Sequence, residues 1–138
     1  MKNLFRLTML FALLFSLSAC GSPQSEAIVS FVEDGCTYDG PDGVVDNPVV
    51  FRYTNTNNHE NFGIAIVTLQ EGYGREDLEA YQGFGEPAFL DHFVALLYNS
   101  PGETTTSEFT LDAGREHFIV CGRDGGPVVS VLAVLTPK

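Results

Sequence analysis

Basic residues are scarce in this sequence. Its 138 residues include 7 Lys and Arg against 18 Asp and Glu, which gives a formal net charge of −11. Without residues 1–19, five basic residues remain against the eighteen carboxylates, and the formal charge is −13. A surface of this kind repels phosphate backbones, so we expect no nucleic-acid partner.

The short motifs of common enzyme classes are also missing. The chain has no G-x-S-x-G elbow, no phosphate-binding P-loop and no H-E-x-x-H zinc motif. We therefore expect a protein that is not an enzyme and has no catalytic residues.

Only one long apolar run is present, and it lies at the start of the chain. Lys2 and Arg6 form a positive head, and residues 7–19 carry no charge. This layout is typical of a secretory signal peptide, and the run is shorter than the roughly 20 residues of a membrane-spanning helix. The stretch Leu17-Ser18-Ala19-Cys20 resembles the lipobox of bacterial lipoproteins. An ordinary signal peptide with a chance cysteine, or a buried N-terminal helix, are the alternatives.

The lipobox resemblance implies a lipid anchor. In that family the signal is cut before the cysteine, which is acylated on its sulfur, for example with palmitate, and on its new amino group. Two acyl chains attach a protein stably to a membrane. We expect residues 1–19 to be a cleaved signal peptide, residues 20–26 to be the lipidated Cys20 and a tether, and residues 27–138 to be one domain. The expected location is extracytoplasmic, anchored to the outer membrane or to the external face of the cell membrane.

Short apolar runs separated by turn residues predict an all-β domain. One helix is expected over residues 75–82, with Leu78 and Tyr81 on the side that faces the core. Seven or so strands with turns between them favour a Greek-key β-sandwich of the immunoglobulin-like kind. The expected strands are residues 28–32, 49–54, 62–69, 93–98, 104–111, 116–121 and 128–135.

Two cysteines remain in the predicted exported domain, Cys36 and Cys121. An even pair in an oxidising compartment favours a disulfide, with two separate buried thiols as the alternative. Such a long closed loop would stabilise the fold by about 4–5 kcal/mol in the chain-entropy account.

Several stretches together resemble the cupredoxin-like β-sandwich modules of small bacterial lipoproteins and secreted proteins. The resemblance covers most of residues 28–137, and it implies a cupredoxin-like sandwich. The stretches are "CTYDGP" from Cys36, "TNTNNHE" from Thr54, "VTLQEGYGREDLEAY" from Val67, "PGE" from Pro101 and "FTLDAGREHFIVC", which ends at Cys121.

The copper ligands of true cupredoxins are incomplete here. A blue-copper site uses two His, one Cys thiolate and usually an axial Met. His59 and Cys121 stand where the first His and the thiolate would be, but residues 122–138 contain no His or Met. We expect no metal and no cofactor. The alternative function is a copper- or other metal-handling or redox protein that uses His59 and Cys121.

A segment rich in aromatic and acidic residues, residues 72–93, is the candidate for binding. It contains Tyr73, Tyr81, Phe84 and Phe89, which could dock another envelope protein or a small ligand. Alternatively, these rings close the open end of the sandwich. The sequence thus predicts a surface-tethered, non-catalytic lipoprotein that serves as a binding or accessory module.

Overall fold

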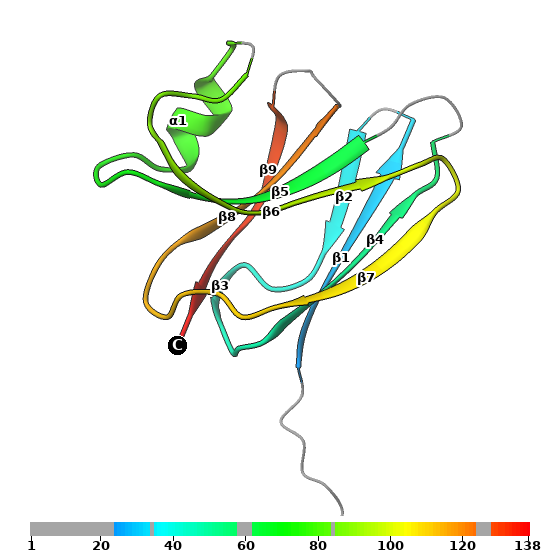
Figure 1. The fold of residues 1–138 in the computed structure, drawn as a ribbon, viewed down its shortest axis with the longest axis horizontal. Helices are drawn as coiled ribbons and strands as arrows, with labels where there is room; N and C mark the ends of the chain where they lie inside the picture. Colours follow the sequence, from blue (N-terminus) through cyan, green and yellow to red (C-terminus); the bar gives the residue numbers. More distant parts are fainter. Residues whose placement is uncertain (1–23, 34, 58–61, 84, 124–127) are drawn as a thin grey trace, which may run out of the picture.

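Two β-sheets pack face to face in the computed structural model (Figure 1). It describes residues 24–33, 35–57, 62–83, 85–123 and 128–138. Sheet A has four strands in the order β2-β1-β4-β7, and sheet B has five in the order β3-β9-β8-β5-β6. The strands of sheet A are β1 (Ser25–Val32), β2 (Gly35–Asp39), β4 (Val49–Asn55) and β7 (Thr104–Phe109). Those of sheet B are β3 (Gly43–Val45), β5 (Phe62–Leu69), β6 (Leu90–Asn99), β8 (His117–Arg123) and β9 (Val128–Pro137).

Most neighbouring strands are antiparallel, but β1 runs parallel to β4 and β3 runs parallel to β9. The chain crosses between the sheets several times, as it does in a Greek-key sandwich. The predicted all-β sandwich is therefore confirmed.

The space between the sheets holds the main core. Alternate residues of β1 and β4 point into it, so that burial follows a period of two along both strands. Phe31 and Phe51 from sheet A meet Ile64, Ile119 and other apolar side chains from sheet B, all fully buried. This alternation is the signal that made these strands visible in the sequence.

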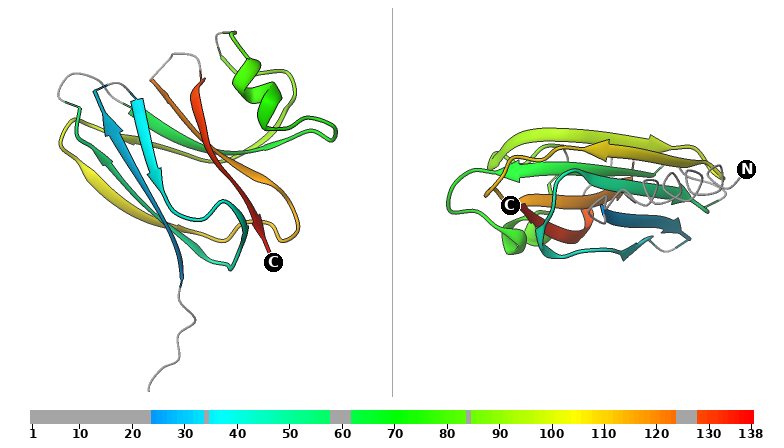
Figure 2. Two further views of the ribbon diagram at one scale, coloured as in Figure 1. Left: turned by 180° about the vertical axis from the view of Figure 1, so that it is seen from behind. Right: turned by 90° about the horizontal axis from the view of Figure 1, so that it is seen from below.

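The outer face of sheet B carries a second apolar cluster. Val67, Phe118, Val120 and Val131 are buried there, together with Leu78 of the short helix α1 (Arg75–Ala80). Figure 2 shows α1 beside β9 when the sandwich is seen from behind. The helix thus forms a partial third layer over sheet B.

Arg75 attaches α1 to the sheet. Its Nη2 donates a hydrogen bond of 2.8 Å to the carbonyl of Val131 on β9. Its Nη1 lies 3.7 Å from Asp42 Oδ2, and the other oxygen of Asp42 accepts a 2.8 Å bond from the Val134 amide. The first residue of the helix is therefore linked to β9 directly and through the residue before β3.

The "CTYDGP" stretch forms β2 and a tight turn. The Tyr38 hydroxyl donates a 2.6 Å bond to the carbonyl of Pro41. Burial, with smaller effects from Asp42 and Asp39, raises the pKa of Tyr38 to about 12, so the hydroxyl keeps its proton. A Cβ atom at Gly40 would lie 2.9 Å from the Cα of Ala27, and this close approach explains a glycine at that position.

The prediction of about seven strands was too low, because the described residues contain nine. The strands that it missed are β2 and β3. Strand β2 is a half-exposed edge strand with Gly and Asp at its ends, and β3 has only 3 residues beside a turn-rich stretch. Neither carries the apolar alternation that identifies a longer strand.

The other element boundaries moved by a few residues. Strand β1 begins at Ser25, so Ser25 and Glu26 of the expected tether pair with Val49 and Val50. Helix α1 ends at Ala80 instead of Gln82. No helix in the described part of the chain has the length and hydropathy that a membrane span requires.

Leu78 provides a test of the second cluster. It is 1% exposed, and we expect Leu78→Ala to lower the free energy of unfolding by about 2–5 kcal/mol, because the truncation leaves a cavity under α1. Leu96→Ala is the matched control at a side chain that is 52% exposed, and its effect should stay within about 0.5 kcal/mol. Urea titration of both variants measures the difference, and equal values would contradict the third layer.

Candidate functional site

A disulfide between Cys36 and Cys121 joins the two sheets, as the sequence predicted. Cys36 lies on β2 of sheet A and Cys121 on β8 of sheet B, with their Cα atoms 6.5 Å apart. Cys121 is fully buried. The bridge therefore ties the sandwich together from inside.

Among the described residues, the ligand set of a blue-copper centre is not assembled. The Cys121 sulfur is bonded to Cys36 and offers no thiolate in this state. His59 lies outside the described residues, and no His or Met follows Cys121 in the chain. Within the described ranges, no group of three or more His, Cys, Asp and Glu side chains is arranged to hold a metal ion.

Asparagine side chains link β4 to the β6–β7 connection. Asn55 Nδ2 donates a 2.9 Å bond to the carbonyl of Asn99, and Asn99 Nδ2 donates a 2.9 Å bond to the carbonyl of Tyr53. Thr105 donates to Asn99 Oδ1 at 2.9 Å. Asn55 and Asn99 are both almost fully buried. These amides serve the backbone and its turns, which is a structural role.

The aromatic segment lies against sheet B. Tyr73 stacks on Phe89 with ring centroids 4.9 Å apart and an interplanar angle of 13°. Tyr81 meets the same Phe89 edge to face at 6.1 Å. Phe84, the fourth ring of the candidate binding segment, lies outside the described residues. Phe89 packs on the outer cluster of sheet B, so these three rings extend the cover of that face and do not close the end of the sandwich.

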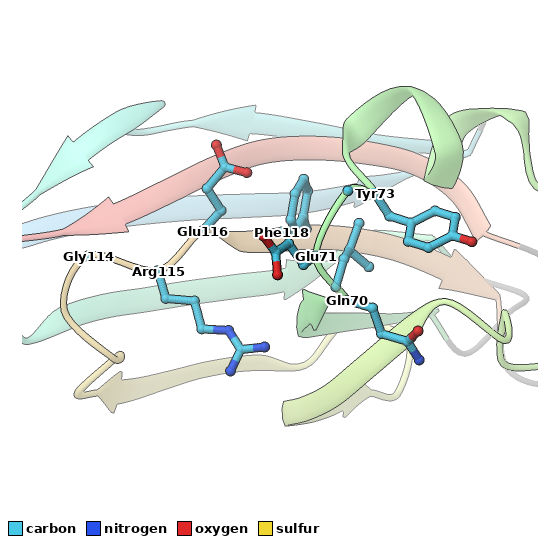
Figure 3. A pocket seen from close by; sticks show the side chains of 9 residues that line it. Gln70, Glu71, Tyr73, Gly114, Arg115, Glu116 and Phe118 are labelled. Carbon is cyan, nitrogen blue, oxygen red and sulfur yellow. The ribbon is translucent and has the colours of Figure 1, made fainter.

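A cleft opens next to Tyr73, between the loop after β5 and the start of β8 (Figure 3). Its volume is about 250 Å³, and it is open to solvent on one side. The lining residues are Leu69, Gln70, Glu71, Gly72, Tyr73, Gly114, Arg115, Glu116 and Phe118. Segments some 45 residues apart in sequence meet there because β5 pairs with β8, with Val67 opposite Phe118.

The charges of the cleft are mainly negative. Glu71 and Glu116 are exposed, and neither forms an ion pair within the described part of the chain. Arg115 is paired with Asp91 on β6. Figure 3 shows the side chains of Arg115 and Glu116 extending to opposite sides of the cleft. The arginine is thus directed away from the carboxylate next to it in sequence.

His117 is fully buried on the inner side of β8, below the cleft. Its Nδ1 lies 2.9 Å from the carbonyl of Arg115, and its Nε2 has no hydrogen-bond partner among the described residues. Burial lowers the pKa of His117 below the ordinary 6.5, although the Arg115 carbonyl and Asp112 act in the opposite direction. The neutral imidazole is the form that the fold favours.

The sequence predicted the bridged cysteines, and of the aromatic residues that it singled out, Tyr73 lines the cleft whereas Tyr81 and Phe89 do not. The second wall of the cleft was not predicted. Glu116 and Phe118 belong to a stretch that was interpreted only as a strand. Strand pairing between β5 and β8 brings this wall to Tyr73, and no local motif marks that pairing.

Comparison with known proteins identifies the fold. No protein-family model matches the chain, and no curated protein matches it in sequence. Its structure is similar to the crystal structure of dithionite-reduced auracyanin from the photosynthetic bacterium Roseiflexus castenholzii. The two align with a TM-score of 0.52 over 82% of this chain and 96% of that chain, at 22% sequence identity. The domain therefore has a cupredoxin-like fold.

Removal of the disulfide tests its contribution to the stability of the fold. The bridge closes a loop with a sequence separation of 85 residues, and Cys36→Ala with Cys121→Ala should lower the free energy of unfolding by about 2–5 kcal/mol. Urea titration without reductant measures this effect. Dithiothreitol should bring the native chain close to the double variant and leave the variant unchanged. A variant as stable as the oxidised native chain would contradict the role.

The buried His117 predicts a loss of stability in acid. The unfolded chain takes up a proton on this imidazole as the pH falls through 6.5, whereas the folded chain resists protonation until a lower pH. The unfolded state then binds more protons than the folded state. The free energy of unfolding therefore decreases as the pH decreases through this window. We expect His117→Gln to reduce that fall between about pH 7 and pH 5. Equal slopes in the native protein and in His117→Gln would refute the assignment.

Proposed function

We propose that the protein is a lipid-anchored lipoprotein of the cell envelope, and that its cupredoxin-like domain is a non-catalytic binding or accessory module. The anchor is proposed from the sequence, where a positive head, an apolar run and the Leu17–Cys20 stretch occur in the order of a lipoprotein signal. Acyl chains on Cys20 would attach the domain to the membrane without a spanning helix.

The observation that supports a binding function is the disulfide bond between Cys121 and Cys36. In this fold the alternative function is copper handling, which needs a free thiolate from Cys121. The Cys121 sulfur is instead bonded to Cys36, and the sequence after it lacks the remaining ligands. If this cupredoxin-like sandwich binds no copper, the function that we propose for it is recognition at its surface. The cleft beside Tyr73 is the surface feature that suits this function.

One preparation tests both parts of this proposal. The full-length chain is expressed in a bacterial host, extracted from membranes in mild detergent without reductant, offered copper and analysed by native mass spectrometry. We expect a chain that begins at Cys20, carries acyl chains, has a mass lower by two hydrogens for the disulfide and retains no copper. Its spectrum should lack the intense visible absorption of a copper–thiolate bond.

Cys20→Ser is the control for the anchor and should lose the acyl mass and the membrane association. An unmodified chain that starts elsewhere would reject the lipoprotein. A reduced chain with one copper ion would instead support the metal-handling alternative with His59 and Cys121.

A further inference from the structure

We propose that the base of the sandwich opens locally in mild acid, because a proton on His117 can be solvated there only in an open state, while the rest of the fold stays intact. The base consists of residues 43–47, 111–117 and 135–138. Figure 1 shows it as the end where β3, the connection from β7 to β8 and the C-terminus come together. This inference goes beyond the proposed function and does not depend on it.

His117 lies where these segments meet. On β8 it pairs with Leu135 of β9, and Leu135 pairs on its other side with Gly43 of β3. The next residue, Phe118, belongs to the outer cluster, so the side chain of His117 points inward, where it is fully buried. Its hydrogen bond to the carbonyl of Arg115 also fastens the chain just before β8. The segments that hold the ring are therefore the ones that must separate before water can reach it.

The ring can take up a proton at one nitrogen only. Nδ1 of His117 lies 2.9 Å from the Arg115 carbonyl, and a carbonyl only accepts hydrogen bonds, so the neutral ring carries its hydrogen on Nδ1. The free lone pair is on Nε2, which is buried and has no hydrogen-bond partner among the described residues. A proton added there creates a buried cation with an unpaired N–H group, and such a group is costly unless water reaches it.

The charges around the ring only partly offset this cost. Burial is the largest influence on the pKa of His117 and lowers it. The Arg115 carbonyl and the Asp112 carboxylate favour the charged ring, the Arg115 guanidinium opposes it, and the backbone of Leu135 favours it least. The other charged side chains of the base are exposed, and solvent screens their fields: Asp46, Glu116 and Lys138.

The strands packed against the ring add no further charge. Neither β3 nor β9 contains an ionisable side chain. From sheet A, the inward residues at this end of β4 and β7 are apolar, Val49 and Phe109, and they pair with each other. The closed base therefore offers the protonated ring no carboxylate on the side of Nε2 that these strands cover.

Few hydrogen bonds hold the base closed. Strand β3 has 3 residues and pairs only with β9. The amide of Gly114 donates a 2.7 Å bond to the carbonyl of Pro137, and the amide of Lys138 donates a 3.1 Å bond to the carbonyl of Val45. Residues 114–116 also line the cleft beside Tyr73, so opening of the base would displace that wall.

Protonation and opening are thermodynamically linked. An imidazole that water reaches titrates near its ordinary pKa of 6.5, whereas burial keeps the pKa of His117 lower in the closed base. The open state then binds more protons than the closed state, so its population rises as the pH falls through 6.5. If the ring did not titrate at all in the closed state, this population would rise by about 25-fold between pH 7 and pH 5, which is the upper limit.

Hydrogen exchange of single amides, measured by NMR on the full chain in detergent, tests the proposal. Two glycine amides form a matched pair, because each donates a 2.7 Å bond from an exposed turn to a carbonyl of another segment. Gly114 bonds to Pro137 in the base, and Gly102 bonds to Asn55 beyond the other end of β7. After correction for the intrinsic exchange rate, we expect the protection of Gly114 to fall several-fold from pH 7 to pH 5 and that of Gly102 to stay within about twofold.

Two variants assign the response to the imidazole. His117→Gln removes the titrating group and keeps a polar side chain, so the protection of Gly114 should no longer fall between pH 7 and pH 5. Asp112→Asn removes the carboxylate that acts on the ring and should retain or increase the response, because the closed base then resists protonation more. Circular dichroism at pH 7 checks the fold of both variants. If His117→Gln does not fold, the glycine pair of the native chain decides the proposal.

Three results would overturn the inference. Equal loss of protection at Gly102 and Gly114 would assign the effect to unfolding of the whole domain, and constant protection at Gly114 would show that the base stays closed. A pH response that persists in His117→Gln would assign it to another group. Exchange requires no lipid, copper or partner, so its outcome is independent of the proposed function.

Discussion

Sheet B must bury both of its faces, and much of the molecule follows from that constraint. Its inner face meets sheet A through Ile64, Ile119 and their neighbours, while Val67 and Phe118 point the other way. A sheet that is apolar on both sides needs two covers. The 20 or so residues between β5 and β6 supply the second cover through Leu78 and Phe89. The aromatic content of this segment is thus mainly a requirement of folding.

The cleft lies where this second cover ends. Tyr73 is the exposed end of the ring stack, and Phe118, which also lines the cleft, is 2% exposed. Leu69 and Phe118 therefore belong both to the covered cluster and to the lining of the cleft. The disulfide limits the relative movement of the two sheets, because it joins β2 of one sheet to β8 of the other.

The sequence predicted the fold better than the site. Strands such as β4 and β5 were predictable because their sequences show alternating apolar residues or a run of β-branched residues. The disulfide was predictable because the expected exported domain contains an even number of cysteines. The edge strands β2 and β3 were not, because edge strands are only partly buried and carry turn residues. The cleft was not predictable either, since it depends on the pairing of β5 with β8 and on the capture of Arg115 by Asp91. Both are contacts between distant residues, and neither has a local pattern.

The start of β1 at Ser25 limits the distance between the domain and its proposed lipid anchor. Ser25 is already paired with Val49, so four residues, 21–24, lie between the sheet and the proposed acylated Cys20, and the chain takes five residue steps from one to the other. A fully extended chain spans at most about 3.6 Å per residue, so the linker from Cys20 to Ser25 is at most roughly 18 Å long. The start of β1 and the C-terminus lie at one end of the sandwich, and Gly114 of the cleft bonds through its amide to Pro137 beside that C-terminus (Figure 1). With the proposed anchor in place, the domain would lie within a thin layer next to the bilayer, and any contact with another protein of that membrane would follow from a search in two dimensions.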